Sequence, residues 1–400
     1  MSSINDIQKK RLTIATAFAF VFMAGYALSA GMLGTLLPRI IEHFDLSVSA
    51  ASTVNIANEI GNTSAMLFAL FVVDRLDKHG LLMFMGLCFG AANLAFGLSP
   101  AFGLLLATRL IIGFSGGLLD NVCATYVSDL YGERRARFVS ILHTLFAIGN
   151  MVGPQFSALC YSIGGWRLSF MVSGLALMLA AVLFFLLTRT VGKPRTSVEQ
   201  EGRAEKARIP YLTIIKRKNL WWLGLGSFLM AGETYLTVAL PTYLDHVDGT
   251  VFTTGYCATI MSAYSLGMLI SRMGLAALSE RLSTATYVRL ASLLGGLLFG
   301  FMLFTSDPML WLAGMFLFGV ISGASYTARF VLSCQEFPLY SSTASAFTGI
   351  FAALGNISFN AVIGGLADAG HYTGAMYMVA GALLIAFLIM SLLYRAPDLG

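Results

Sequence analysis

Most of this chain consists of long stretches without charged side chains. Of its 400 residues, 57% are hydrophobic and 11% are charged, and the mean hydropathy is +0.77. This number of charged residues is too small to cover the surface of a soluble globule of this length. Lipid must therefore solvate the chain. A membrane-spanning helix needs roughly 20 apolar residues. Twelve charge-poor stretches of about this length occur: 13–37, 50–72, 80–98, 102–127, 138–162, 167–188, 219–241, 253–277, 286–305, 308–334, 342–367 and 372–394.

These stretches predict an all-α membrane protein with twelve transmembrane helices. A transmembrane β-barrel would need short segments of alternating hydrophobicity. The run from Leu175 to Leu187 does not alternate, so the sequence excludes a barrel.

The second half of the chain repeats the first about 206 residues later. Asp74-Arg75-Leu76 recurs as Glu280-Arg281-Leu282, and Gly149-Asn150 recurs as Gly355-Asn356. We therefore expect a six-helix bundle over residues 1–188, a polar linker over 189–218 and a second six-helix bundle over 219–400. Duplicated membrane bundles commonly move a solute between their halves, so the repeat favours a transporter.

The basic residues predict the orientation in the membrane. The net charge of +5 would suggest nucleic acid as a partner of a soluble protein, but here the position of the charges decides. If the N-terminus is cytoplasmic, 20 of the 25 Lys and Arg residues fall on cytoplasmic segments. The positive-inside rule then places both termini in the cytoplasm, in a bacterial inner membrane, and no nucleic-acid partner is expected.

The sequence gives no sign of enzyme chemistry. The five cysteines are scattered singly, without the spacing of metal ligands. No phosphate-binding loop of the Gly-x-x-x-x-Gly-Lys-Ser/Thr type and no catalytic constellation occurs. We expect no enzyme activity, no cofactor and no metal.

Three motifs resemble those of the major facilitator superfamily, and the resemblance covers the whole chain. Leu70-Phe-Val-Val-Asp74-Arg75-Leu-Asp-Lys78 resembles the loop between helices 2 and 3, although Leu70 and Asp77 replace its usual glycines. Leu105-x-x-x-Arg109-x-x-x-Gly113 resembles the helix 4 motif. Gly149-x-x-x-Gly153-Pro154 resembles the helix 5 motif of antiporters, with Ser157-Ala158 in place of its final glycines.

Helices 4 and 5 also resemble one branch of that superfamily. Gly116-Gly117-Leu-Leu-Asp120-Asn121, followed by Leu142-His143-Thr-Leu-Phe146, is similar to the fucose and glucose/mannose proton symporters. This resemblance implies symport of a monosaccharide with a proton. Arg329, in the tenth stretch, departs from the sugar pattern.

Asp120 is the candidate proton-coupling residue. It lies deep in an expected helix among glycines and apolar residues, where burial disfavours the charged carboxylate. His143 is a candidate relay, because an unperturbed imidazole titrates near neutral pH. The alternative is a permanent partnership of Asp120 with Arg109 or His143. Arg109 precedes Asp120 by eleven residues, about three turns, so a direct pair would need a bridging group.

Polar residues within the expected helices are candidates for solute binding. Asn55, Asn58, Glu59 and Asn62 share one helical face, which is either a seam to a neighbouring helix or a solute contact. Glu233 is the acid of the second half. Neutral amides both donate and accept hydrogen bonds, which suits a polyol, although helix packing explains them nearly as well. The candidate solute-binding residues are Asn55, Glu59, Asn62, Asn121, Asn150, Glu233, Asn356 and Asn360.

The remaining charged residues are assigned to a gate or to the helix ends. Asp74, Arg75, Glu280 and Arg281 are the candidate gate, since acids beside helix ends can form bonds between helices that break on opening. Arg272 and Arg329 lie toward helix ends and are expected to snorkel to the interface. If they face the cavity instead, they favour an anionic solute.

The sequence thus predicts a monomeric secondary transporter whose partners are the lipid bilayer, a small polar solute and a proton. Proton symport of a monosaccharide is the first hypothesis. The alternative is a proton-coupled exporter of drugs, metabolites or organic anions.

Overall fold

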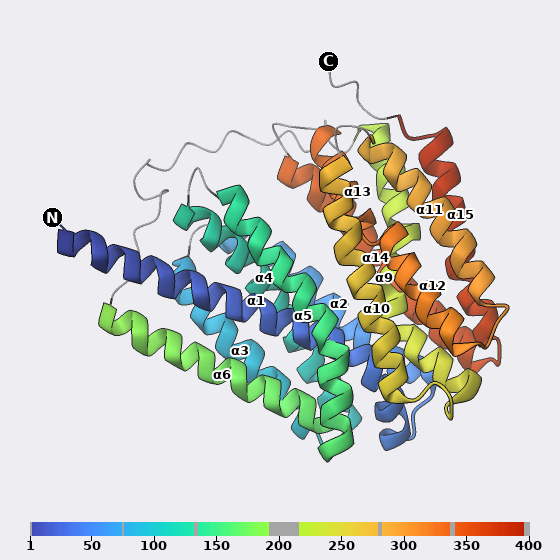
Figure 1. Ribbon diagram of the computed structural model, residues 1–400, viewed down its shortest axis with the longest axis horizontal. Helices are drawn as coiled ribbons and strands as arrows, with labels where there is room; N and C mark the ends of the chain where they lie inside the picture. Colours follow the sequence, from blue (N-terminus) through green and yellow to red (C-terminus); the bar gives the residue numbers. More distant parts are fainter. Residues whose placement is uncertain are drawn as a thin grey trace. The chain divides into compact units, whose positions relative to one another are not determined.

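The structure is a computed structural model that describes residues 2–73, 76–131, 135–191, 216–278, 282–336 and 341–395. Within these ranges it is built from α-helices (Figure 1). Their bounds are α1 Ser2–Phe44, α2 Val48–Val72, α3 Lys78–Leu98, α4 Phe102–Tyr131, α5 Arg135–Gly164, α6 Trp166–Val191, α9 Lys218–Asp248, α10 Thr254–Leu278, α11 Thr284–Met302, α12 Pro308–Ser322, α13 Ser325–Glu336, α14 Ser341–Asp368 and α15 Tyr372–Leu392.

The expected twelve-helix membrane fold is confirmed. Each apolar stretch forms a helix, and α12 with α13 makes a single candidate span, Pro308–Glu336. When α12 and α13 are counted as one span, twelve candidate transmembrane helices are described. Nine of them are long and apolar enough to cross a membrane by length and composition; α2, α5 and α10 are not among the nine. In α2 the reason is the polar face that begins at Asn55.

Three of the helices begin at side-chain caps that the sequence supplies. Asp77, which replaces a glycine of the family motif, accepts a hydrogen bond from the backbone N–H of Gly80 and starts α3. Ser283 caps α11 in the same way. Asp307 caps α12 and is followed by Pro308, whose fixed φ suits the first helical position.

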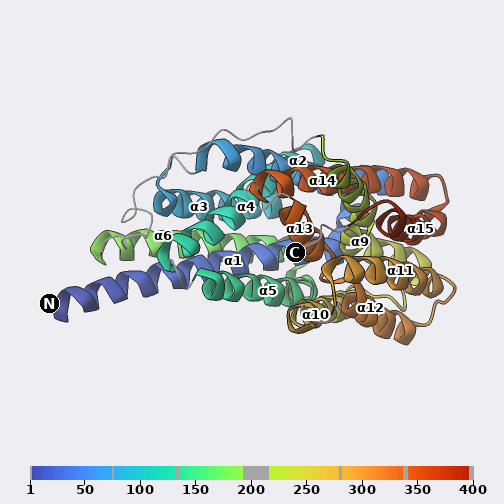
Figure 2. The ribbon, with the colours of Figure 1, turned by 90° about the horizontal axis from the view of Figure 1, so that it is seen from above.

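The chain forms two compact units. The first contains Met1–Leu33 and Ala57–Lys206, and the second contains Gly34–Ile56 and Ala207–Gly400. In the first unit α3 packs against α6 and α4, and in the second α10 packs against α12, α9 against α14 and α11 against α15. Figures 1 and 2 both show α3 beside α6 and α11 beside α15.

The internal repeat extends to individual helix crossings. In the first unit Gly61 of α2 lies directly against the α4 backbone, and in the second Gly267 of α10 lies directly against the α12 backbone. A Cβ on either glycine would collide with residues that are themselves 206 positions apart: Leu110 and Phe114 for Gly61, Phe316 and Val320 for Gly267. Each unit therefore repeats the same close crossing, which only a residue without a side chain permits.

Candidate functional site

Asp120 and His143 lie together in the first unit. Asp120 is on α4, His143 is on α5, and the two side chains interact electrostatically. Asp120 is partly accessible and His143 is exposed on the surface of the protein chain. Gly116 lets α4 approach the rings of Tyr26 and Phe89 just before the acid. Asp120 and His143 are thus near enough to interact with each other.

Arg109 does not join this pair. Its side chain is 3% exposed, and its charged partner is Glu59 on α2. The guanidinium carbon also lies 5.9 Å from the centre of the Phe96 ring, within range of a cation–π contact. The Nε and Nη1 atoms are buried without a hydrogen-bond partner among the described residues. Arg109 therefore compensates Glu59 and is not the partner of Asp120.

The polar face of α2 packs partly against α4. The backbone of Asn58 lies where a Cβ on Gly113 would be, and the side-chain oxygen of Asn62 lies against Gly117. Together with the Glu59–Arg109 pair, these contacts favour the first of the two alternatives, a seam between α2 and α4. Solute contact by this face of α2 stays a prediction. Asn55, the first residue of this face, is 8% exposed and belongs to the second unit.

The glycines of the helix 5 motif serve helix packing. A Cβ on Gly149 would lie 2.6 Å from the carbonyl oxygen of Ala24, and one on Gly153 would lie 2.5 Å from that of Leu28. Asn150 follows the first glycine, and its carbonyl oxygen meets Gly31 of α1. Asn121 is exposed at the next position after Asp120. The motif thus joins α5 to α1, a role that does not depend on the direction of transport.

Glu233 and Arg329 lie near each other in the second unit. Glu233 on α9 is 6% exposed, interacts electrostatically with Arg329 on α13, and lies within hydrogen-bonding reach of the Ser322 hydroxyl. Arg329 is 3% exposed and donates from Nη1 to the Met230 sulfur at 2.9 Å. The expectation that Arg329 snorkels to the interface is therefore wrong, because Glu233 offers it a carboxylate in the interior.

A break between α12 and α13 sets the direction of Arg329. At Gly323 the chain passes so close to Met268 of α10 that a Cβ would collide with its backbone. The Tyr287 hydroxyl accepts from the backbone N–H of Ala324 at 3.1 Å and donates to the carbonyl oxygen of Ile321 at 3.0 Å. A side chain thus satisfies the backbone groups that the break releases.

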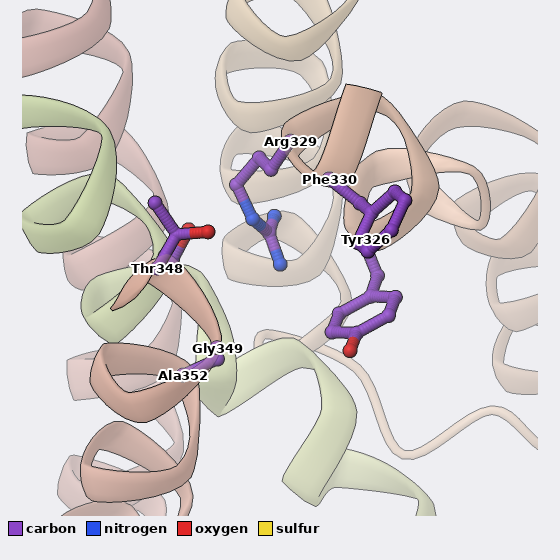
Figure 3. A pocket seen from close by; sticks show the side chains of 7 residues that line it. Tyr326, Arg329, Phe330, Thr348, Gly349 and Ala352 are labelled. Carbon is purple, nitrogen blue, oxygen red and sulfur yellow. The ribbon is translucent and has the colours of Figure 1, made fainter. Parts of the chain in front are cut away.

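A small recess opens beside Arg329. Its cavity volume is about 20 Å³, and it is lined by α9, α13 and α14. Figure 3 shows the Arg329 side chain projecting between Thr348 on α14 and Tyr326 on its own helix. Tyr326 and Gly349, two lining residues, follow Asp120 and His143 by 206 positions. The recess is therefore the repeat equivalent of the Asp120–His143 neighbourhood.

Asn356 and Asn360 lie one turn apart on α14. The Asn360 amide nitrogen donates to the backbone oxygen of Asn356 at 2.7 Å. The side-chain oxygens of both are buried without a hydrogen-bond partner among the described residues. These two oxygens are unused acceptors within a spanning helix.

Sequence reasoning missed a contact between the first two helices and the second half of the chain. Arg39, near the end of α1, forms ion pairs with Asp245 of α9 and Glu42, and donates to Thr254 of α10 at 3.1 Å. Asp368, at the end of α14, accepts from the N–H groups of Val48 and Ser49 and so caps α2. We call these contacts the clasp. No local signal reveals it, because its partners lie hundreds of residues apart.

The comparison with protein families decides the class. The sequence profile of the Major Facilitator Superfamily matches residues 18–263 and again residues 227–399. The chain belongs to the Major Facilitator Superfamily. This superfamily membership makes it a transporter and, together with its spanning helices, an integral multi-pass membrane protein.

Relatives within the superfamily carry different solutes. The chain is 26% identical over 283 residues to the uncharacterized MFS-type transporter YtbD of Bacillus subtilis, covering 70% of this chain and 68% of that one. It is 21% identical to the cis,cis-muconate transport protein of Acinetobacter baylyi, over 94% of both chains. The arabinose-proton symporter of Escherichia coli is 22% identical over 52% of this chain and 43% of its own.

A solved structure of the superfamily has the same fold. The crystal structure of the nucleoside transporter NupG superposes with a TM-score of 0.76 at 14% identity, over 96% of this chain and 99% of that one. At this identity the likeness concerns the fold alone. These comparisons show the superfamily; the finer resemblance to fucose and glucose/mannose symporters stays a prediction.

The family's gate motif falls where the structure gives no description. Asp74, Arg75, Glu280 and Arg281 all lie outside the described residues. Four residues after Asp74 in the sequence, Lys78 of α3 forms an ion pair with Asp129 of α4 at 2.7 Å.

Proposed function

We propose that this protein is a proton-coupled secondary transporter that moves a small polar solute by alternating access. Asp120 binds the transported proton, and His143 exchanges protons with it. Both termini lie in the cytoplasm, in keeping with the basic segments that the positive-inside rule assigns to that side.

The observation that carries this proposal is the position of Asp120. A carboxyl group within a spanning helix is costly when charged, and such groups commonly mark proton relays. Asp120 has His143 beside it, while Arg109 is occupied by Glu59. A permanent ion pair with arginine would keep the carboxylate charged, whereas a partner that itself titrates lets it take up and release a proton.

A monosaccharide is the first candidate solute. The motif around Asp120 and His143 resembles sugar symporters, and one relative is an arabinose-proton symporter. The unused acceptor oxygens of Asn356 and Asn360 suit solute hydroxyls. The further candidate solute-binding residues are Asn55, Glu59, Asn62, Asn121, Asn150 and Glu233.

A proton-coupled exporter or carrier of organic anions is the second candidate. The buried Arg329 beside a recess favours an anion, and one relative transports cis,cis-muconate. A multidrug resistance protein of Klebsiella pneumoniae is also related, at 27% identity over 68% of this chain.

The test is uptake of labelled hexoses, deoxyhexoses and organic anions into proteoliposomes, with and without an inward proton gradient. The proposal expects the gradient to stimulate uptake of at least one solute, and a proton ionophore to abolish the stimulation. Asp120→Asn is expected to lose the stimulation. Asp307→Asn is its matched control, because it removes a carboxylate from a helix start that asparagine caps equally well. Uptake that ignores the gradient in every case would contradict proton coupling.

A further inference from the structure

Two arginines and one glutamate form a charged group within the second unit. Arg272 on α10 and Arg329 on α13 interact electrostatically with the same two phenols, those of Tyr287 and Tyr326. Glu233 is the carboxylate that interacts with Arg329. Two guanidinium groups and one carboxylate leave one positive charge uncompensated in this group.

The buried position of the Arg329 guanidinium is energetically costly. Placing an arginine at the centre of a spanning helix costs roughly 2.5–3.5 kcal/mol on insertion scales, so such residues face a bundle interior or a wet cavity and mark functional sites. Arg329 faces the recess lined by Tyr326 and Thr348 (Figure 3). The recess is thus the place where an anion can reach it.

In the described part of the chain, Arg272 has a buried hydrogen-bond donor without a partner, and the acceptor of Arg329 is a weak one. A guanidinium has five N–H donors. Among the described residues, Arg329 donates to the sulfur of Met230, a weak acceptor. The Nε atom of Arg272 is buried and has no hydrogen-bond partner there. Buried donors without partners are costly, so their presence points to a group that supplies acceptors.

The backbone adds to the positive field. α13, a helix of 12 residues, begins at Ser325, next to the break that Tyr287 stabilises. The Ser325 hydroxyl oxygen is also buried without a partner in the described part. The positive end of the α13 dipole therefore lies about one turn before Arg329.

We propose that Arg272, Arg329, Tyr326 and the start of α13, together called the arginine site, bind the carboxylate of a small organic anion. The proposal rests on the second candidate of the proposed function, a transporter of organic anions, and names the carboxylate as the group that the protein recognises. One carboxylate matches the single uncompensated charge, and the planar arginine fork suits two carboxylate oxygens. The solute is then a small carboxylic acid anion, such as a sugar acid, rather than a neutral sugar.

The test measures binding of matched pairs of compounds to the purified protein in detergent by isothermal titration calorimetry. Glucuronate is compared with glucose, and benzoate with benzamide, so that charge is the main difference within each pair. We expect the native protein to bind at least one carboxylate roughly tenfold or more tightly than its neutral partner, the usual weight of a charge-assisted hydrogen bond. Arg329→Gln abolishes this preference, and Arg329→Lys keeps part of it.

Arg289→Gln is the matched control. Arg289 lies in the same unit, but it is not one of the residues that line the recess, and it hydrogen-bonds to the backbone oxygens of Met390 and Tyr394. Its replacement removes the same charge and leaves the preference for carboxylates intact. Size-exclusion profiles and thermal unfolding show whether each variant is folded.

Three results would overturn the arginine site. They are equal affinity for the charged and neutral partners, an unchanged preference in both Arg329 variants, and no binding of either carboxylate. Because binding is measured without a gradient, it separates from the proposed function. A carboxylate preference without gradient-driven uptake contradicts proton coupling alone, and gradient-driven uptake without the preference contradicts the arginine site alone.

Discussion

Arg39 of α1 pairs with Asp245 of α9, although 206 residues separate them. Both belong to the second unit, which takes in the end of α1 and the start of α2. α1 is one continuous helix from Ser2 to Phe44, and its residues up to Leu33 belong to the first unit. The single helix α1 thus belongs to both units. The contacts of Arg39 in the clasp attach the end of α1 to the other helices of the second unit.

The Arg39–Asp245 pair is expected to stabilise the fold. Their side chains are 17% and 25% exposed, so solvent screens the pair only in part. Arg39→Gln, Asp245→Asn and the double variant form a cycle whose interaction energy we expect to be about 1 kcal/mol. Unfolding in detergent measures it. Glu42→Gln is the control, because Glu42 is 55% exposed and its loss is expected to change little; strict additivity of the two single changes would show that the pair contributes nothing.

Asp368 is expected to act as a helix cap supplied by another helix. It accepts hydrogen bonds from the first N–H groups of α2. Asp368→Ala is expected to cost about 1 kcal/mol, whereas Asp368→Asn retains an acceptor and costs less. Hydrogen exchange at residues 48–50 reports the effect locally. Equal exchange in the native protein and the alanine variant would mean that α2 begins without this cap.

Arg109 and Glu59 are expected to be a compensated pair. Removing one partner of a buried pair leaves an uncompensated charge and costs about 3–5 kcal/mol, so Arg109→Gln is expected to destabilise strongly. Adding Glu59→Gln restores stability, because the leftover carboxylate is gone. Thermal unfolding of the native protein and the three variants measures this. If Glu59→Gln worsens the defect instead, Glu59 has another role, such as solute contact.

The repeated glycine crossings are expected to respond alike in both units. Gly113→Ala and Gly319→Ala place a methyl group against the backbone of Asn58 and Tyr264, respectively, and each is expected to cost about 2 kcal/mol. Gly365→Ala in α14 is the control, since a Cβ there meets nothing within 4 Å. It is expected to gain up to about 1 kcal/mol from helix propensity. A harmless substitution at either crossing would contradict the close approach.

The sequence predicted the helices and the repeat because both follow from local composition and from residue spacing. Asp120 and His143 were chosen as candidates from their positions within apolar helices, and their role as the proton site stays a prediction. The break at Gly323 could not be predicted, because it depends on Met268 and Tyr287, which approach from other helices. Arg329 was misplaced for the same reason, since its burial depends on Glu233 being opposite. The clasp joins charges that look like ordinary loop residues in the sequence.

Asp120 as the proton site is the central claim, and one measurement in proteoliposomes tests it most directly. Solute exchange at equal pH on both sides needs binding and alternating access, whereas accumulation against a concentration gradient also needs the proton. We predict that Asp120→Asn keeps exchange near the native rate and loses accumulation driven by an inward proton gradient. Accumulation by Asp120→Asn at the native level would contradict the account.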